Sequence, residues 1–219
     1  HVNVLQFLID LGLTIKDVKA INNWAFRYAA RNGHVHVLQF LVDLGLTVED
    51  ARDKGDNWSL RSAAKNGHVN VLQFLVDFGL SAEDARAQDN YAFRLAASRG
   101  HVNVLQFLVN LGLTAEDARD DNNWAFRLAT HHGHINVLQF LVNLGLTAED
   151  ARANNNWAFS WAAQNGHIHV LQFLVDLGLT VEDAKADNNY AFRRAAACRY
   201  INVLQFLVDL GLTIEDARD

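Results

Sequence analysis

The stretch GHINVLQFLVNLGLTAEDARA, residues 133–153, decides the fold of this chain, because most of the sequence is built from variants of it. Its segment VLQFL occurs seven times and is followed by Val in every copy except the first, where Ile9 follows. The copies begin at Val4, Val37, Val71, Val104, Val137, Val170 and Val203, which gives a spacing of 33 residues with one step of 34. A fixed period of this size is typical of stacked supersecondary units rather than of one globular core.

The first part of a repeat reads as a short helix. In the unit that spans residues 121–153, the segment Trp124–His131 follows Asn123, a residue type that caps helix N-termini. Phe126 and Ala129 lie three residues apart, so they share a helical face that is expected to pack inward. Gly133 supplies the positive φ that ends a helix.

The rest of the repeat predicts two further helices and no strand. A second helix is expected from Ile135 to about Leu144, and Gly145 ends it. Its apolar residues at core spacing are Val137, Leu138, Leu141 and Val142. Thr147 and Asp150 are spaced to form a capping box, so they predict the start of a third, short helix.

These segments resemble the repeats of the ankyrin family. GHVNVLQFLVNLGL, residues 100–113, is similar to the family's G-H-L-x-V-V-x-L-L-L-x-x-G-A half, and the period agrees. WAFRLA, residues 124–129, stands where ankyrin repeats carry T-P-L-H-x-A, without the proline and with Arg127 in place of the histidine. GLTAEDARA, residues 145–153, replaces the hairpin segment G-A-D-V-N-A.

The resemblance implies an all-α, ankyrin-like helical solenoid of about 33 residues per repeat, in which a short third helical turn replaces the β-hairpin. It covers residues 1–219 as a single array. The expected units are a partial repeat, 1–20, and full repeats at 21–53, 54–87, 88–120, 121–153, 154–186 and 187–219. The resemblance also implies protein–protein recognition through the concave face, with no catalytic residue to carry over.

One face of the first helix varies between repeats while the second helix barely changes. The varied positions are spaced i, i+3 and i+4, so they form one helical face, which lines the concave groove in ankyrin-like stacking. The expected partner-binding residues are Tyr28, Arg31, Asn32, Ser62, Lys65, Leu95, Arg99, Leu128, His131, His132, Trp161, Gln164 and Arg194. A recognition surface explains this pattern, and bulky aromatic residues are frequent binding anchors. The alternative is a face that is exposed and unconstrained.

Two further columns of residues recur in the first helices. The aromatic column is Trp24, Trp58, Tyr91, Trp124, Trp157 and Tyr190, and the arginine column is Arg27, Arg61, Arg94, Arg127 and Arg193. The aromatic residues could stack on a ligand, but a scaffold role against the short third helix is the simpler expectation. The arginines could read an anion, but pairing with the Glu-Asp carboxylates of a neighbouring TxEDAR segment is the simpler account.

Histidines recur after the glycine that ends the first helix, at His34, His68, His101, His134 and His167. Stacked helices lie roughly 8–10 Å apart, too far for histidines of successive repeats to share a zinc ion. We therefore expect these side chains to bind local backbone. The cluster of His131, His132 and His134 leaves a metal site or a pH response open, but neither a metal nor a cofactor is predicted.

Composition excludes several classes of function. The net charge of −6 argues against sequence-independent nucleic-acid binding and against an anionic membrane surface. Gln interrupts every VLQFL segment, so no apolar run is long enough to insert into a membrane. The single cysteine, Cys198, cannot form an internal disulfide, which is compatible with a reducing, intracellular and cytoplasmic setting.

These patterns predict a non-enzymatic module that binds a protein partner, of unknown identity, through its first-helix face. The alternative is a structural subunit that assembles through the uncapped helices at its two ends, since terminal repeats normally carry a polar outer face. The last repeat also has Arg199-Tyr200 where the others have Gly-His. Loss of that glycine is expected to tighten or distort the turn.

Overall fold

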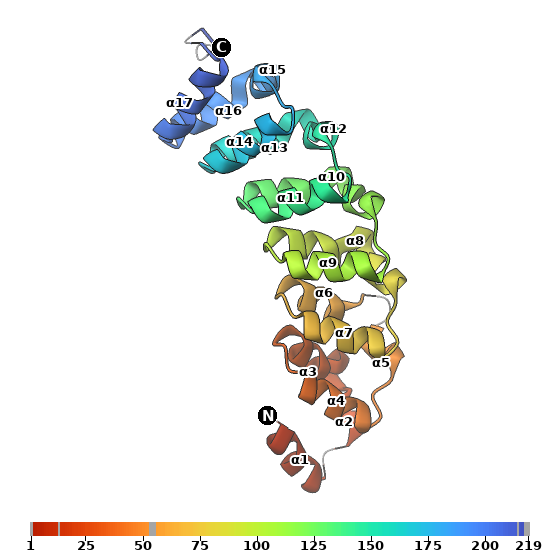
Figure 1. Ribbon diagram of the computed structural model, residues 1–219. Helices are drawn as coiled ribbons and strands as arrows, with labels where there is room; N and C mark the ends of the chain where they lie inside the picture. The colour runs from red at the N-terminus through yellow and green to blue at the C-terminus, as the bar shows by residue number, and fades with distance from the viewer. Residues whose placement is uncertain (1, 13, 53–55, 214, 217–219) are drawn as a thin grey trace. The chain divides into compact units, whose positions relative to one another are not determined.

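The computed structural model describes residues 2–12, 14–52, 56–213 and 215–216, and within them the chain is α-helical without a strand (Figure 1). The first helices lie in α3 (Ala20–Arg31), α6 (Trp58–Lys65), α8 (Ala82–Ser98), α10 (Ala115–His131), α13 (Ala153–Gln164) and α16 (Ala186–Ala197). The second helices are α1 (Val2–Asp10), α4 (Val35–Asp43), α7 (Val69–Asp77), α9 (Val102–Leu111), α11 (Ile135–Leu144), α14 (Ile168–Asp176) and α17 (Ile201–Leu210). The third helices are α2 (Ile15–Val18), α5 (Val48–Arg52), α12 (Ala148–Ala151) and α15 (Val181–Ala184), or they form the start of α8 and α10.

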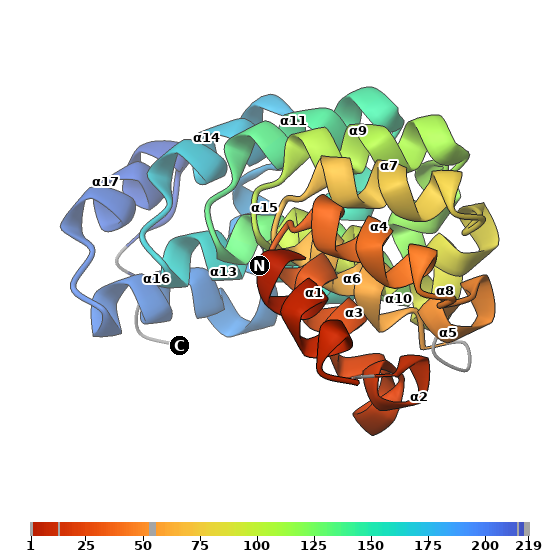
Figure 2. The same cartoon turned by 90° about the horizontal axis from the view of Figure 1, so that it is seen from below.

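Two compact units make up the chain. Unit 1 comprises residues 1–96 and 103–113, and unit 2 comprises residues 97–102 and 114–219. In unit 1, first helices α3 and α6 pack side by side, as do second helices α4 and α7 (Figure 2). In unit 2, α13 lies between α10 and α16, and α14 lies between α11 and α17. Each unit therefore has two helical layers, and the prediction of an all-α repeat fold is confirmed.

The core of each unit is the interface between these layers. Val137, Leu138 and Leu141 on α11 are fully buried, as the spacing predicts, whereas Val142 is only half-buried. Phe126 of the first helix is also fully buried, together with its equivalents Phe26, Phe93 and Phe159. Small alanines beside these rings allow the helices to approach closely, so each repeat buries its apolar stripe against its neighbours.

A left-handed turn joins the third helix to the first helix of the next repeat. In unit 2, Asp121, Asn122 and Asn123 have φ of 54°, 55° and 58°. The residues with the same conformation in other repeats are Gln88, Asp89 and Asn90, Asn154, Asn155 and Asn156, and Asp187, Asn188 and Asn189. Asn and Asp tolerate this conformation better than other residues with a side chain, so the recurrent DNN segment specifies a turn.

The asparagine that ends this turn does not cap the first helix as the sequence suggested. Asn57 begins α6 but makes no side-chain cap hydrogen bond. Its amide nitrogen instead donates to the backbone carbonyl of Asp84, 3.1 Å away on the third helix of the same repeat. Asn23 donates in the same way to the carbonyl of Asp50 at 3.0 Å. The side chain therefore ties the start of a first helix to the third helix of the same repeat instead of closing the helix end.

The short third helix begins at the predicted capping box. Thr147 donates its backbone N–H to the Asp150 carboxylate at 2.8 Å. The same carboxylate accepts hydrogen bonds from Arg119 of the preceding repeat, with Arg119 Nε 2.9 Å from Asp150 Oδ1. Burial would raise the pKa of Asp150, but these hydrogen bonds outweigh it and hold the pKa below its usual 3.8. One carboxylate thus caps its helix and ties it to the previous repeat.

The ion pair between Arg119 and Asp150 recurs in other repeats, and it corrects the prediction made for the arginine column. The cation–Asp pairs are Lys19–Asp50, Arg52–Asp84, Arg119–Asp150, Arg152–Asp183 and Lys185–Asp216. Inter-repeat pairing with these carboxylates was expected of the arginine column, but the basic residue of the TxEDAR segment itself fills that role. This residue lies at the end of one third helix, next to the Asp of the following one.

Histidine rings pack on the glycines that end the first helices of preceding repeats. His167 Nε2 lies 3.0 Å from the carbonyl oxygen of His131, and a Cβ on Gly133 would meet the His167 ring at 2.9 Å. His68 and His134 make equivalent contacts in their repeats. The predicted backbone partner is confirmed, but it belongs to the previous repeat and is not local.

The last repeat keeps this geometry with different residues. Tyr200 lies where the histidine does, with its ring over Gly166. Arg199 adopts φ of 61° in place of the glycine, and Tyr200 N–H still donates to the Ala195 carbonyl at 3.0 Å. The expected distortion of the turn is therefore wrong, because Arg199 accepts the left-handed conformation at an energetic cost.

Candidate functional site

The predicted binding residues differ in exposure along the array. In unit 1, Tyr28, Arg31, Asn32 and Lys65 are exposed, Leu95 is half-buried and Ser62 is buried. In unit 2, Arg99 and His132 are exposed, whereas Leu128, His131, Trp161, Gln164 and Arg194 are half-buried. Asn32 also has a local role, since its amide donates to the Tyr28 carbonyl at 2.7 Å and closes α3.

Unit 1 contains a hollow of about 240 Å³ on this face. We call it the Ser62 hollow, and its lining residues are Arg31, Trp58, Arg61, Ser62, Lys65, Asn66, Tyr91 and Leu95. Four of the predicted residues, Arg31, Ser62, Lys65 and Leu95, are thus brought together. Ser62 carries the smallest side chain found at its register, where other repeats have Tyr, Leu, Trp or Arg, so the small side chain leaves the space open.

Arginines cover the aromatic rings in and around the Ser62 hollow. The Arg27 guanidinium lies 4.5 Å from the centre of the Trp58 ring, and Arg61 and Arg94 lie 5.3 Å and 5.2 Å from the centre of the Tyr91 ring. A cation over an aromatic face is attracted by the negative potential of that face. The chain's own cations therefore lie over the faces of both rings.

Unit 2 has a filled surface at the equivalent position. Trp161 replaces the serine, and its ring centre lies 5.1 Å from that of Trp157 and 6.1 Å from that of Trp124. The Arg127 guanidinium lies 4.4 Å from the centre of the Trp124 ring and 4.6 Å from that of Trp157. We call Trp124, Arg127, Trp157 and Trp161 the tryptophan cluster. Burial lowers the pKa of Arg127, and Asp121 partly offsets this effect.

A histidine group adjoins the tryptophan cluster. The His131 ring lies 5.0 Å from that of Trp161 and 4.8 Å from that of His132. Burial, together with the nearby His131 and His134, lowers the pKa of His132, which favours its neutral form. No group of three or more potential metal ligands in binding geometry is found among the residues that the structure describes.

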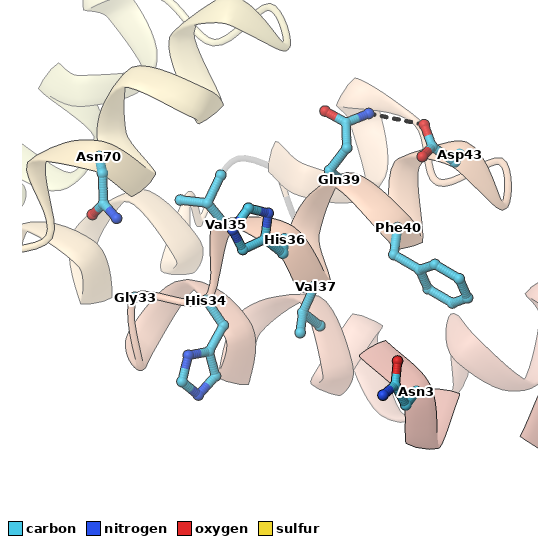
Figure 3. A pocket seen from close by; sticks show the side chains of 10 residues that line it. All are labelled: Asn3, Gly33, His34, Val35, His36, Val37, Gln39, Phe40, Asp43 and Asn70. Carbon is cyan, nitrogen blue, oxygen red and sulfur yellow. Dashed lines mark hydrogen bonds between the residues drawn. The ribbon is translucent and has the colours of Figure 1, made fainter. Parts of the chain in front are cut away.

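A second and larger hollow lies on the other helical layer of unit 1. It measures about 800 Å³, and α1 contributes Asn3 to its wall while α4 contributes His36, Gln39 and Phe40 (Figure 3). Gln39 donates to Asp43 at 2.8 Å across one helical turn. The same pair recurs on other second helices, as at Gln73 and Asp77, so this surface presents the constant part of the repeat.

Sequence reasoning missed three of the residues that line the Ser62 hollow. Trp58, Arg61 and Tyr91 were assigned to structural columns, yet they line it beside the predicted residues. The available signal was their spacing, since Trp58 and Tyr91 lie four positions before the varied residues Ser62 and Leu95, on the same helical face. The free cysteine, Cys198, is exposed in unit 2 and belongs to neither the Ser62 hollow nor the tryptophan cluster.

The stacked helical hairpins define an all-α repeat protein. Residues 60–156 match the family model described as ankyrin repeats, in three copies. The ankyrin repeat domain of human ASB11 has a similar fold, with a TM-score of 0.68 and 18% sequence identity over 86% of this chain and 84% of that chain. A search of curated protein sequences finds no significant match. The family match and the shared fold support the ankyrin-repeat family, as the sequence resemblance indicated.

Proposed function

We propose that the chain is an interaction module that binds a protein partner through its first-helix face. Ankyrin repeats are generally protein–protein interaction modules, which supports this class of function. Among the helices that the structure describes, none is long and apolar enough to cross a membrane. The proposed binding residues are those of the varied face, with the Ser62 hollow in unit 1 and the tryptophan cluster in unit 2.

The observation that carries this proposal is the contrast in side chains on a constant backbone. The second helices present the same exposed polar pairs in most repeats. At the position shared by Ser62 and Trp161, by contrast, the surface is hollow in one repeat and filled in another. Tyr28, at the same register, is 45% exposed and stacks on Trp24 with 4.6 Å between ring centres. Exposed aromatic residues beside cations are typical of binding hot spots.

The proposal is tested by selecting partners from a displayed peptide library and measuring their affinities for surface variants. Tyr28→Ala in unit 1 and His132→Ala in unit 2 alter the first-helix face, and His36→Ala alters the larger hollow on the second-helix layer. We expect at least one first-helix variant to weaken binding by about tenfold or more, since an anchor residue contributes over about 1.4 kcal/mol. The proposal would be refuted if Tyr28→Ala and His132→Ala bound the selected partner as tightly as the wild type while His36→Ala bound it more weakly.

A second candidate function is assembly through the terminal helices. Phe7 and Leu11 are 62% and 69% exposed at one end, and Ile201 and Val208 are 77% and 48% exposed at the other. Large exposed apolar side chains favour association. Light scattering over a range of concentrations tests this candidate, because assembly requires the mean mass to rise with concentration and Ile201→Lys to reduce that rise.

A further inference from the structure

We propose that the Ser62 hollow binds an acidic side chain, a carboxylate or a phosphoryl group, on the polypeptide that the first-helix face recognises. This inference rests on the proposed function and adds the chemistry of the partner. The hollow lies entirely within unit 1, and its shape, charge and aromatic contacts point to the same kind of occupant.

The charge of the hollow is opposite to that of the chain. Arg31, Arg61 and Lys65 line it, and none of its lining residues is acidic, although the chain as a whole carries a net charge of −6. Asp56 balances Arg61, with Arg61 Nη2 2.7 Å from the Asp56 carboxylate. Arg31 adds a second guanidinium to the wall of the hollow, 5.7 Å from the centre of the Tyr28 ring. Charges further away than about 8 Å are screened at physiological salt, so the local cations decide which group enters.

The aromatic contacts in the hollow argue against a cationic ligand. Trp58 and Tyr91 would suit a cationic ligand if their faces were open, since aromatic rings recognise ammonium and guanidinium groups. Arg27 already lies over Trp58, and Arg61 and Arg94 lie over Tyr91. A cationic ligand would have to displace these arginines and would meet their repulsion. An anion instead can reach the guanidinium groups of Arg31 and Arg61, which line the hollow.

The size of the hollow favours one side chain and not a folded surface. About 240 Å³ accommodates a glutamate or a phosphorylated serine with some water. Ser62 sets this size, since Leu95 and Leu128 occupy its register in the following repeats. Leu at this position is therefore compatible with the repeat and would fill the hollow without changing its charge.

The test measures the binding of three labelled peptides of one length to the full chain by fluorescence anisotropy. The peptides are rich in glutamate, in phosphoserine or in glutamine. We expect the two acidic peptides to bind and the glutamine peptide to bind at least tenfold more weakly. The stronger of the two acidic peptides identifies whether carboxylate or phosphoryl chemistry is preferred.

Matched variants locate the binding. Ser62→Leu is expected to weaken acidic-peptide binding by at least tenfold, whereas Ser62→Ala, which keeps the hollow open, changes it less than twofold. Lys65→Gln is expected to weaken binding about fivefold, whereas Lys16→Gln on α2 removes the same charge from unit 1 with less than a twofold effect. Thermal unfolding of each variant verifies its fold, and the Lys65 pair retains the test if Ser62→Leu unfolds.

Three outcomes would overturn the inference. Equal binding of all peptides removes the charge argument, and unchanged binding by Ser62→Leu assigns the effect to general surface charge. Tighter binding of a single-stranded oligonucleotide with the same dependence on Ser62 and Lys65 assigns the hollow to nucleic acid. If Tyr28→Ala weakens a library-selected partner while Ser62→Leu does not, the proposed function stands and this inference alone fails.

Discussion

The Ser62 hollow and the tryptophan cluster occupy the same register of the repeat and present opposite surfaces. In unit 1 a serine leaves a hollow of about 240 Å³ lined by three cationic residues. In unit 2 Trp161 fills that place and contacts Trp157, Trp124 and His131. Both positions lie on first helices, α6 and α13, and the cation–Asp pairs between repeats occur in both units. One side-chain position therefore changes the chemistry of the face without altering the scaffold.

This difference predicts that the tryptophan cluster mainly stabilises the fold, whereas the Ser62 hollow is available for binding. The tryptophan cluster buries aromatic surface and an arginine, so it is expected to stabilise unit 2. The Ser62 hollow leaves polar surface open to solvent, so it contributes little stability and is available to a ligand. Substitutions at matched positions in the two units should therefore affect stability in unit 2 and binding in unit 1.

The largest expected effect is that of Trp161→Ser in unit 2. Loss of its ring contacts should lower the free energy of unfolding by about 2–3 kcal/mol, less than for a fully buried tryptophan because Trp161 is half-buried. Ser62→Trp is the matched change in unit 1 and should cost under about 1 kcal/mol, because space is present. Urea unfolding measures both. Equal losses in the two units would show that Trp161 stabilises unit 2 no more than Ser62 stabilises unit 1.

The next effect is that of Arg127→Gln, which removes the cation of the tryptophan cluster. Arg127 is only 5% exposed and lies over two indole rings at 4.4 Å and 4.6 Å, so we expect a loss of about 1–2 kcal/mol. Arg127→Lys keeps the charge but loses the planar stack, and it should recover only part of the loss. Full recovery by lysine, read from the same urea curves, would show that charge alone matters.

A smaller effect, equal in both units, is expected at the inter-repeat ion pairs. Asp84→Asn in unit 1 and Asp183→Asn in unit 2 each remove a carboxylate bound by an arginine at 3.0 Å or 2.9 Å. Each should cost about 1 kcal/mol at neutral pH, since the carboxylates are mostly buried and hydrogen-bonded. Markedly unequal losses would show that the two units differ in the contacts between their successive repeats and not in the first-helix face.

These pairs also predict a pH dependence. Burial would raise the pKa of Asp84 and Asp183, but the hydrogen bonds from Arg52 and Arg152 leave both below the usual 3.8. A carboxyl group with a lowered pKa stabilises the fold above 3.8, and this contribution disappears as the pH falls through its folded-state value. The asparagine variants should therefore differ from the wild type at pH 7 and converge on it in strong acid. A constant difference down to the lowest measurable pH would contradict this linkage.

The smallest effect is a gain in the last repeat. Arg199 has φ of 61° where the other repeats have glycine, so Arg199→Gly should raise the free energy of unfolding by about 0.5–1 kcal/mol. Gly166→Ala is the reverse change, and its Cβ would meet the Tyr200 ring at 3.1 Å. Thermal unfolding of both variants tests the assignment, which would be wrong if Arg199→Gly were destabilising.

The scaffold could be predicted from the sequence because its signals are local. The capping box of Thr147 and Asp150, the stop at Gly145 and the buried Leu138 and Leu141 each depend on residues within one repeat. The cation that pairs with Asp150 could not be predicted in this way. Arg119 and the arginine column are both plausible partners, and only the stacking of successive repeats decides between them.

The candidate site could be predicted only as a set of varied positions. The sequence grouped Ser62 with Trp161 by register, but it could not show that one leaves a hollow and the other fills it. That outcome depends on neighbours from adjacent repeats, such as Tyr91 beside Ser62 and Trp124 beside Trp161. The DNN segments were a missed local signal, since runs of Asn and Asp tolerate left-handed backbone.

Binding of a partner to the first-helix face is tested by hydrogen exchange of the full chain with and without a library-selected partner. We expect slower amide exchange on binding in the first helices, such as α3 and α6 in unit 1, with α4 and α7 unchanged. Slower exchange confined to α1, α4 and α7, around the larger hollow, would contradict it.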